Sequence, residues 1–443
     1  MKLRRKKRKT KVKKVIKSLS DPRRMIIFIL CVAILSVSIF LIASRPTDID
    51  KINMDYGEVL DVELLKSNAT AKFKDTYELK DYTIYGENLM LYENMYSAEN
   101  TDSLQGKNVV VRNIETMEEL NFTFSGGVDS GIDLNALSEG MYEVYVYDHY
   151  VKKRVFFTDE VNTEEFTTMR RNGKVKSISI HASSTYLSEI GIDYKKNYVF
   201  ITVFENTPIA SNVDVVLDPR GLINNPETGE TDYGLSNDTM SEAKESYEFA
   251  LLVKEELEKM GLKVLINREK DQSLSYYGKK GRVGVGYESN ALLFISLGMT
   301  ADATISRPYI VTSPYTVGLL ANEIAYTMKD NGLELNAVST ADMLQVGVRF
   351  DKLMQDEFGY YYEFEYYPQL RESGGKSTFA GQYDVSGENE RYANSYGMYA
   401  IDFVFANMGS EESLKYYKDH KITLAIQLAK GISEYYHIES NEE

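Results

Sequence analysis

The sequence contains no tryptophan, one cysteine and four histidines in 443 residues, and these scarcities limit its chemistry. The single cysteine, Cys31, lies inside a long apolar run, so the rest of the chain has no disulfide and no thiol nucleophile. No Gly-x-Ser-x-Gly motif occurs, which leaves a serine hydrolase of that type without support. The composition, with its lack of tryptophan, fits an AT-rich bacterium.

The segment near the N-terminus carries the strongest signal. Residues 25–44 are twenty consecutive residues without charge, enough for a helix to cross a hydrocarbon core of roughly 30 Å. The 24 residues before it hold thirteen Lys or Arg and one acid, Asp21. By the positive-inside rule this tail stays cytoplasmic and the chain after Arg45 is exported. A cleaved signal peptide is the rival interpretation, but its apolar region is shorter, about 7–15 residues. We expect an uncleaved signal-anchor, single-pass in the cell membrane.

The charge of the exported part excludes one class of partner. The chain has 51 basic and 66 acidic residues, and removing residues 1–24 leaves 38 basic and 65 acidic, a formal charge of −27. Such a surface keeps the protein soluble and repels nucleic acid. The basic tail directly precedes the apolar run, which favours topogenic charge beside anionic lipid headgroups over nucleic-acid binding.

The exported part divides into three regions by pattern. Residues 45–73 are polar, have no sustained period and are predicted to form a stalk. Residues 74–206 hold short runs rich in Val, Ile, Tyr and Phe, which predicts a β-sandwich-like module. Its role as a spacer, a partner-binding surface or a sugar-binding surface stays open. Between 211 and 438 strands alternate with helices, which predicts an α/β fold, a mixed sheet flanked by helices.

Two stretches inside the α/β region have distinct compositions. The tyrosine-rich run 359–367 predicts a strand or hairpin, whose rings either pack in the core or form a sugar-binding face. The polar, Gly-rich stretch 371–395 predicts a surface loop.

Several motifs of the α/β region occur in a recognisable order. One strand ends in Asp218-Pro219-Arg220-Gly221, and a later strand reads Phe294-Ile295-Ser296-Leu297-Gly298, with Arg282 twelve residues before Phe294. The last strand contains Asp402, with Asn407 close behind. In this order and spacing, residues 213–438 resemble the zinc-dependent N-acetylmuramoyl-L-alanine amidases, which cut the bond between muramic acid and L-alanine in peptidoglycan.

The resemblance assigns the family's working positions to residues of this chain. It places the three zinc ligands at Gly221, Glu242 and Gly298, and the catalytic glutamate at Asp402. Two of the three ligand positions are therefore glycine, which has no side chain to bind a metal. Catalytic zinc needs three protein ligands and an open position for water, and two carboxylates alone suit magnesium or calcium better. We predict no zinc and no other cofactor, and hence a pseudoenzyme.

Basic residues near these positions suggest two further hypotheses. Without zinc, Glu242 and Asp402 would face each other as uncompensated carboxylates, which raises one pKa or destabilises the fold. Arg220 carries a permanent charge and is predicted to reach Glu242, Asp402 or both; the alternative is that it points to solvent.

The Gly-rich stretch 278–286 contains three basic residues. Lys279, Lys280 and Arg282 are predicted to line a ligand groove as a small basic patch. The alternative for this stretch is close packing through its glycines.

The sequence thus predicts a membrane-anchored, extracytoplasmic, amidase-like protein that does not hydrolyse. It would bind cell-wall peptidoglycan, or regulate or position a true amidase. Two alternatives stay open: an active peptidoglycan amidase with a reorganised site, and an envelope scaffold whose groove has no function. The expected partners are the membrane, peptidoglycan or its glycopeptides, and another envelope protein in the regulatory version.

Overall fold

The computed structural model describes most of the chain after residue 61. The described residues are 62–69, 75–85, 87–93, 104, 106–124, 131–163, 165–276, 278–302, 304–312, 318–336, 343–350, 354–355, 361–362, 377–380 and 398–438. The basic tail, the expected anchor at 25–44 and most of the expected stalk lie outside them. Within these ranges no helix has the length and apolar content to cross a membrane. The chain divides into two compact units, Met1–Leu65 and Lys66–Glu443.

The end of the region expected to be a stalk is helical. Residues Val62–Ala69 form α4, and its last residue, Ala69, is buried. Asn68 donates a hydrogen bond from Nδ2 to the carbonyl of Ile114 at 2.7 Å, and Tyr194 donates from Oη to the carbonyl of Ala69 at 3.0 Å. Side-chain contacts therefore tie residues 68 and 69 to the β module, so any stalk ends before them.

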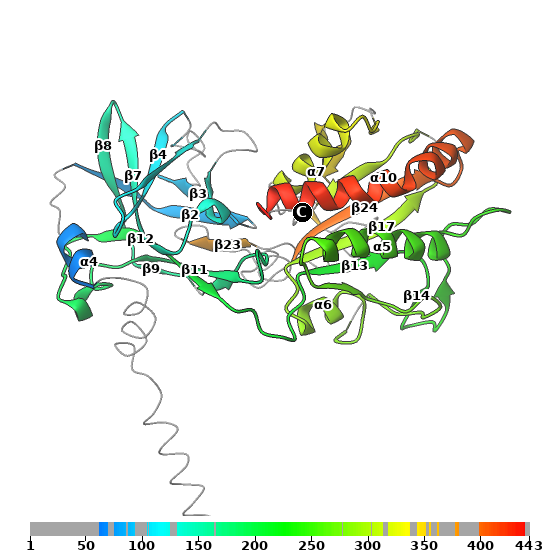
Figure 1. Cartoon of the computed structure of the whole chain (residues 1–443), viewed down its shortest axis with the longest axis horizontal. Helices are drawn as coiled ribbons and strands as arrows, with labels where there is room; N and C mark the ends of the chain where they lie inside the picture. Colours follow the sequence, from blue (N-terminus) through cyan, green and yellow to red (C-terminus); the bar gives the residue numbers. More distant parts are fainter. Residues whose placement is uncertain are drawn as a thin grey trace, which may run out of the picture. The chain divides into compact units, whose positions relative to one another are not determined.

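The β module consists of two sheets (Figure 1). The larger sheet has the strand order β10-β11-β12-β8-β7-β4-β5, with β1 on β8 and β9 on β11; the smaller has the order β23-β2-β3-β6. The strands of the larger sheet are β1 (Thr76–Leu79), β4 (Asn108–Asn113), β5 (Glu119–Thr123), β7 (Gly140–Asp148), β8 (Val151–Phe157), β9 (Val161–Asn162), β10 (Phe166–Thr167), β11 (Val175–Ala182) and β12 (Asn197–Asn206). Those of the smaller are β2 (Asp81–Tyr85), β3 (Asn88–Tyr92), β6 (Ile132–Asp133) and β23 (Ser377–Ala380).

One apolar core joins the two sheets of the β module. Along β7, Val144 and Val146 point to the same face and contribute to a buried cluster with Ile84 and Leu91 of the smaller sheet. Residues at alternate positions of a strand share a face, so the intervening side chains of β7 lie on the other face. This is the two-sheet sandwich that the strand pattern predicts.

The interpretation of residues 371–395 as a surface loop is wrong for its central segment. Ser377–Ala380 form β23, which pairs antiparallel with β2 in the register Thr83↔Phe379. Phe and Thr favour strands, and this short β-prone sequence was hidden by the polar, Gly-rich composition around it. Of the run 359–367, the structure describes 361–362 as β22, paired with β21 (Met354–Gln355) as a short hairpin.

The α/β domain is built on a mixed seven-stranded sheet of order β16-β13-β17-β24-β18-β20-β19. Its first four strands are parallel, and β18 is antiparallel to β24. The strands are β13 (Val215–Pro219), β16 (Val264–Ile266), β17 (Leu293–Thr300), β18 (Tyr309–Thr312), β19 (Met343–Gln345), β20 (Val348–Phe350) and β24 (Tyr399–Asn407). A separate hairpin consists of β14 (Ile223–Asn224) and β15 (Thr231–Asp232).

Helices pack on both faces of this sheet, as expected, but unevenly. The helices are α5 (Glu242–Lys259), α6 (Gly284–Glu288), α7 (Leu319–Asp330) and α10 (Glu411–Tyr435). The three longer ones share a core with one face of the sheet, and Figure 1 shows α5 and α10 beside β13, β17 and β24. On the other face, the tight approach of Gly286 in α6 to Val216 and Met398 makes room for the short helix.

Candidate functional site

Three adjacent parallel strands place polar residues side by side on one face of the α/β sheet, next to the carboxyl end of β13. Asp218 of β13, Ser296 of β17 and Asp402 of β24 are neighbours in register, and all three are fully buried. Alternation along β17 places Ser296 and Gly298 on the face opposite the helices α5 and α10. The carboxyl ends of parallel strands are where open α/β sheets bind ligands, so this edge is the candidate site.

Glu242 joins the edge as the first residue of α5. Its Oε2 accepts a hydrogen bond from the backbone N–H of Leu235 at 2.9 Å, and its Oε1 accepts one from Met299 N–H at 2.7 Å. The side chain is almost fully buried. A carboxylate is favoured at a helix N-terminus, and here both of its oxygens already receive backbone donors.

Arg220 follows β13 and lies across the edge toward both carboxylates. Its Nη2 donates to Oδ2 of Asp402 at 2.5 Å, its Nη1 donates to the carbonyl of Met299 at 3.1 Å, and Nη1 lies 3.9 Å from Oε1 of Glu242. The side chain of Arg220 is 16% exposed, while that of Asp402 is 0% exposed. The contact expected from the sequence is present; the further idea that Arg220 takes the place of a metal charge stays a prediction.

The glycines at the two family ligand positions make room for other groups. A Cβ at Gly298 would lie 2.3 Å from Cδ of Arg220, so the arginine side chain occupies the space that a residue at 298 would need. A Cβ at Gly221 would lie 2.7 Å from Cβ of Ala243, and Gly221 has φ +78°, a value that favours glycine. The side chain of Arg220 and the glycine at 298 therefore depend on each other sterically.

The interpretation of Arg282 as part of an exposed patch is wrong. Arg282 is fully buried, its Nη1 lies 2.9 Å from Oδ1 of Asp218, and the guanidinium also donates to the carbonyls of Pro219, Gly221 and Leu222. These hydrogen bonds stabilise the turn that follows β13. The turn at the start of the 278–286 stretch sends residue 282 inward, which composition alone does not reveal.

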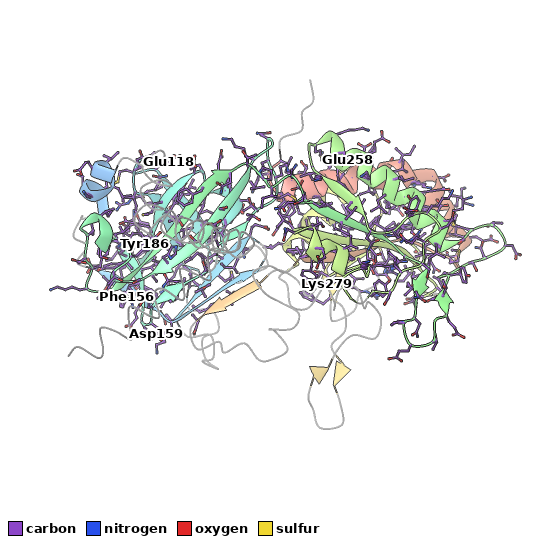
Figure 2. All side chains as sticks on the ribbon, turned by 90° about the horizontal axis from the view of Figure 1, so that it is seen from below. Glu118, Phe156, Asp159, Tyr186, Glu258 and Lys279 are labelled. Carbon is purple, nitrogen blue, oxygen red and sulfur yellow. The ribbon has the colours of Figure 1, made fainter. Side chains whose placement is uncertain are left out.

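The two lysines of that expected patch do reach solvent. Lys279, labelled in Figure 2, has a side chain 88% exposed and lies 3.6 Å from Glu288. Lys280 is also exposed. Of the three residues of the expected patch, Lys279 and Lys280 are the two that a ligand can contact.

Arg268 lies two residues after the end of β16. It is buried and donates to the carbonyls of Pro219 and Ala243 at 3.0 and 2.7 Å. Burial lowers its pKa to about 10, and the nearby Arg282 adds to the effect. Its neighbour Asn267 donates to Oδ1 of Asp218 at 2.9 Å.

The sequence did not single out Tyr276 and Ser296 as functional residues, although both are buried at the site. Burial and the carboxylate of Asp218 raise the pKa of Tyr276, and Oγ of Ser296 has no hydrogen-bond partner within the part of the chain that the structure describes. Nothing in their local sequence distinguishes them from core residues.

The charges at this edge balance without a metal. Arg220 pairs with Asp402 and lies 3.9 Å from Glu242, Arg282 pairs with Asp218, and Arg268 adds a third positive charge near Asp218. The chain's four histidines bond elsewhere, for example His420 to the carbonyl of Tyr416. Zinc needs imidazole, thiolate or carboxylate ligands with free lone pairs, and the residues present do not fit it.

Asn407, the residue that follows the last strand in the motif, has a structural role. Its Nδ2 donates to the carbonyls of Asp302 and Ile305 at 2.6 and 2.7 Å, and its Oδ1 accepts from Gly409 N–H at 2.8 Å. These bonds hold two loops at the end of β24.

The chain has similarity to known proteins among solved structures. No family model matches the chain, and no curated protein matches it. Among solved structures, the chain is similar to the N-acetylmuramyl-L-alanine amidase Ami1 from Mycobacterium abscessus, with 16% identity, 51% of this chain and 99% of that chain covered, and a TM-score of 0.34. It is also similar to the N-acetylmuramoyl-L-alanine amidase AmiC2 of Nostoc punctiforme, with 17% identity, 50% of this chain and 96% of that chain covered, and a TM-score of 0.30. A third similar structure is the CwlD amidase from Clostridioides difficile, solved in complex with the GerS lipoprotein. Its identity is 16%, 52% of this chain and 100% of that chain are covered, and the TM-score is 0.32.

Proposed function

We propose that this chain is a membrane-anchored, extracytoplasmic protein with an amidase-like domain that binds cell-wall peptidoglycan without hydrolysing it. The observation that carries the proposal is the position of Arg220, whose guanidinium pairs with Asp402 and fills the space over Gly298. The basic tail and the apolar run 25–44 support the anchor, and their orientation supports an exported domain.

The geometry opposes hydrolysis at this edge for two reasons. A zinc hydrolase lowers the pKa of a metal-bound water toward about 7, and neither glycine can supply a ligand for the metal. A general base must reach the attacking water, but the carboxylate of Asp402 is fully buried and held by a guanidinium.

Binding remains open to this domain because its surface chemistry does not depend on a metal. Lys279 and Lys280 present two ammonium groups beside the edge on an otherwise acidic protein. They match carboxylates of stem peptides, which are the anionic groups of a wall glycopeptide.

The test uses the full-length chain purified in detergent and incubated with insoluble peptidoglycan. We expect the protein to sediment with the wall material and to release no L-alanine-linked peptide. Lys279→Ala/Lys280→Ala should reduce the sedimented fraction, while Lys415→Ala, a lysine on the exposed face of α10, should not.

Three outcomes would change the proposal. Released peptide would establish an active amidase with a reorganised site. Failure to sediment, with co-purification of an envelope protein, would favour the scaffold. If the lysine substitutions leave the sedimented fraction unchanged, the protein binds the wall but does not bind it through Lys279 and Lys280.

A further inference from the structure

The turn between β7 and β8 has an unusual backbone for its residues. The strands are joined by His149 and Tyr150, with Asp148 paired to Val151, and both turn residues have positive φ, 48° and 67°. Two-residue hairpin turns with φ above zero at both positions strongly prefer Asn-Gly or Asp-Gly. Bulky residues in this region are strained, and such strain is found where a side chain is needed for function.

The two turn residues present their side chains to solvent. Tyr150 is 100% exposed and the side chain of His149 is 92% exposed, so neither residue gains packing energy that would explain its presence. Tyr147, three residues earlier on β7, is also partly exposed at 37%. An aromatic group held in solvent on a strained turn is therefore available to a partner rather than to the core.

These side chains border an open depression of about 630 Å³. The value falls within the range of about 300–1,000 Å³ that is typical of ligand sites. The depression lies where β4 begins and β7 ends, and these two strands are in register at Asn108↔Tyr147. Its lining residues are Gly106, Lys107, Asn108, Tyr147, Asp148, His149 and Tyr150.

The polar groups of the depression are fixed in place. Lys107 donates to Oδ1 of Asp148 at 2.8 Å, Lys153 donates to Oδ2 at 2.7 Å, and Nδ1 of His149 lies 3.1 Å from Oδ1. The hydrogen bond from Lys107, followed by that from Lys153, holds the pKa of Asp148 well below its usual range. The lining of the depression thus holds the carboxylate of Asp148, the ammonium group of Lys107 and the amide of Asn108, with one charge of each sign.

We propose that this depression, which we call the hairpin-tip site, binds a neutral N-acetylated glycan chain. A sugar ring has one face of C–H groups, which packs on an exposed tyrosine ring, and a rim of hydroxyl and acetamido groups, which need donors and acceptors. Tyr147 and Tyr150 supply the ring surfaces. Lys107, Asn108 and Asp148 supply the donors and acceptors. A nucleic acid would be repelled by the −27 charge of the exported chain.

This site lies in the β module and shares no residue with the Arg220 edge. It deepens the proposed function by naming the glycan backbone as the ligand, and it rests on that function only for the choice of polymer. The two proposals can fail separately, because the lysine pair is tested against whole peptidoglycan and the hairpin-tip site against a peptide-free oligosaccharide.

In the test, an N-acetylglucosamine oligomer of about six units is titrated into the full-length chain in detergent, and its affinity is measured by isothermal titration calorimetry. Tyr150→Ala should weaken binding by about tenfold or more, which corresponds to the loss of one well-packed aromatic contact. Tyr233→Ala is the matched control, since Tyr233 is 68% exposed in the other domain, and it should leave binding unchanged.

A second variant separates binding from folding. His149→Asn/Tyr150→Gly installs the turn residues that this backbone prefers, so it should raise the thermal midpoint and abolish binding together. Absence of binding by the wild-type chain, or equal binding by the Tyr150→Ala and Tyr233→Ala variants, would overturn the proposal. Sedimentation with peptidoglycan in that case would leave the proposed function standing and exclude only the hairpin-tip site.

Discussion

The β module and the α/β domain each contain a buried arginine–carboxylate cluster, and the two clusters differ in composition and place. In the middle of the larger β sheet, Glu143 pairs with Arg112 at 2.5 Å and with Arg154 at 2.9 Å. The guanidinium of Arg154 lies 4.2 Å from the centroid of the Tyr198 ring, which closes the cluster on that side. Two cations thus share one carboxylate among aromatic rings.

In the α/β domain, the contacts of Arg220 have the opposite ratio and a different position. A single guanidinium, that of Arg220 just after β13, lies against two carboxylates, Asp402 within β24 and Glu242 at the start of α5. Arg112, Glu143 and Arg154 all lie within strands, whereas Arg220 follows the carboxyl end of a parallel strand, which is where open α/β sheets bind ligands. The comparison suggests that the first cluster specifies the sheet, while Arg220 lies at the end of the sheet where open α/β folds in general bind ligands.

Removing the shared carboxylate of the β cluster should have the largest effect. Glu143→Ala leaves Arg112 and Arg154 buried without their partner, and the free energy of unfolding should fall by about 3–5 kcal/mol. Urea unfolding followed by near-UV circular dichroism measures the loss. A change below about 1 kcal/mol would mean that the aromatic rings, rather than the ion pairs, hold the two arginines.

Arg220→Ala should lower the free energy of unfolding somewhat less, by about 3 kcal/mol. The buried Asp402 loses the guanidinium of Arg220, while Glu242 keeps its two backbone donors. The partial exposure of Arg220 lets water reach the vacated position and limits the loss. The same urea titration applies. An unchanged unfolding midpoint would show that the arginine does not stabilise the strand ends.

Gly298→Ala tests the steric dependence directly. The new methyl group would collide with Cδ of Arg220 and displace it from Asp402, at a cost of about 1–3 kcal/mol. In an Arg220→Ala background the same change should cost far less, and this double-mutant cycle isolates the coupling. Equal costs in both backgrounds would show that Gly298 is not required by Arg220.

The two domains should also differ in their response to acid. In the β module, burial lowers the pKa of His181 to about 4, below the unfolded value of about 6.5. The unfolded chain therefore binds the proton first, and stability is lost as pH falls from about 6.5 toward 4. Between pH 7 and pH 5 the loss should be about 1–2 kcal/mol. His181→Gln should remove this part of the pH dependence, whereas Arg220 keeps its charge throughout.

The smallest effect is expected at the protein surface. Arg307 pairs with Glu334 at 2.6 Å and with Glu412 at 2.7 Å, both of which are well exposed. Arg307→Ala should cost about 1 kcal/mol or less, and it serves as the matched control for Arg220→Ala. A cost as large as that of Arg220→Ala would remove the distinction between edge and surface.

Sequence patterns predicted the elements whose signals are local. The strand ending at Asp218, the strand through Phe294–Gly298 and the last strand with Asp402 were predicted, and they form β13, β17 and β24. The proximity of Arg220 to the carboxylates could be predicted because the family resemblance places Glu242 and Asp402 in one site with Gly221, the neighbour of Arg220. The inward position of Arg282 depends on a turn in three dimensions and could not be read from the basic composition of 278–286.

Long-range pairing was also beyond the sequence. Strand β23 lies in a polar stretch and pairs with β2, almost 300 residues earlier in the chain. Such pairing depends on an available sheet edge rather than on the segment's own pattern. The hairpin tip was missed for another reason. His149 and Tyr150 are not the residue types usually found in such a turn, and only their backbone angles reveal it.

The most direct test of the central claim is the zinc content of the full-length protein after dialysis against zinc and then against zinc-free buffer. If Arg220 takes the place of the metal charge, the wild-type chain should hold far less than one zinc per chain, and added chelator should not change its unfolding midpoint. One tightly bound zinc per chain, whose removal destabilises the protein or stops release of peptide from peptidoglycan, would contradict the account.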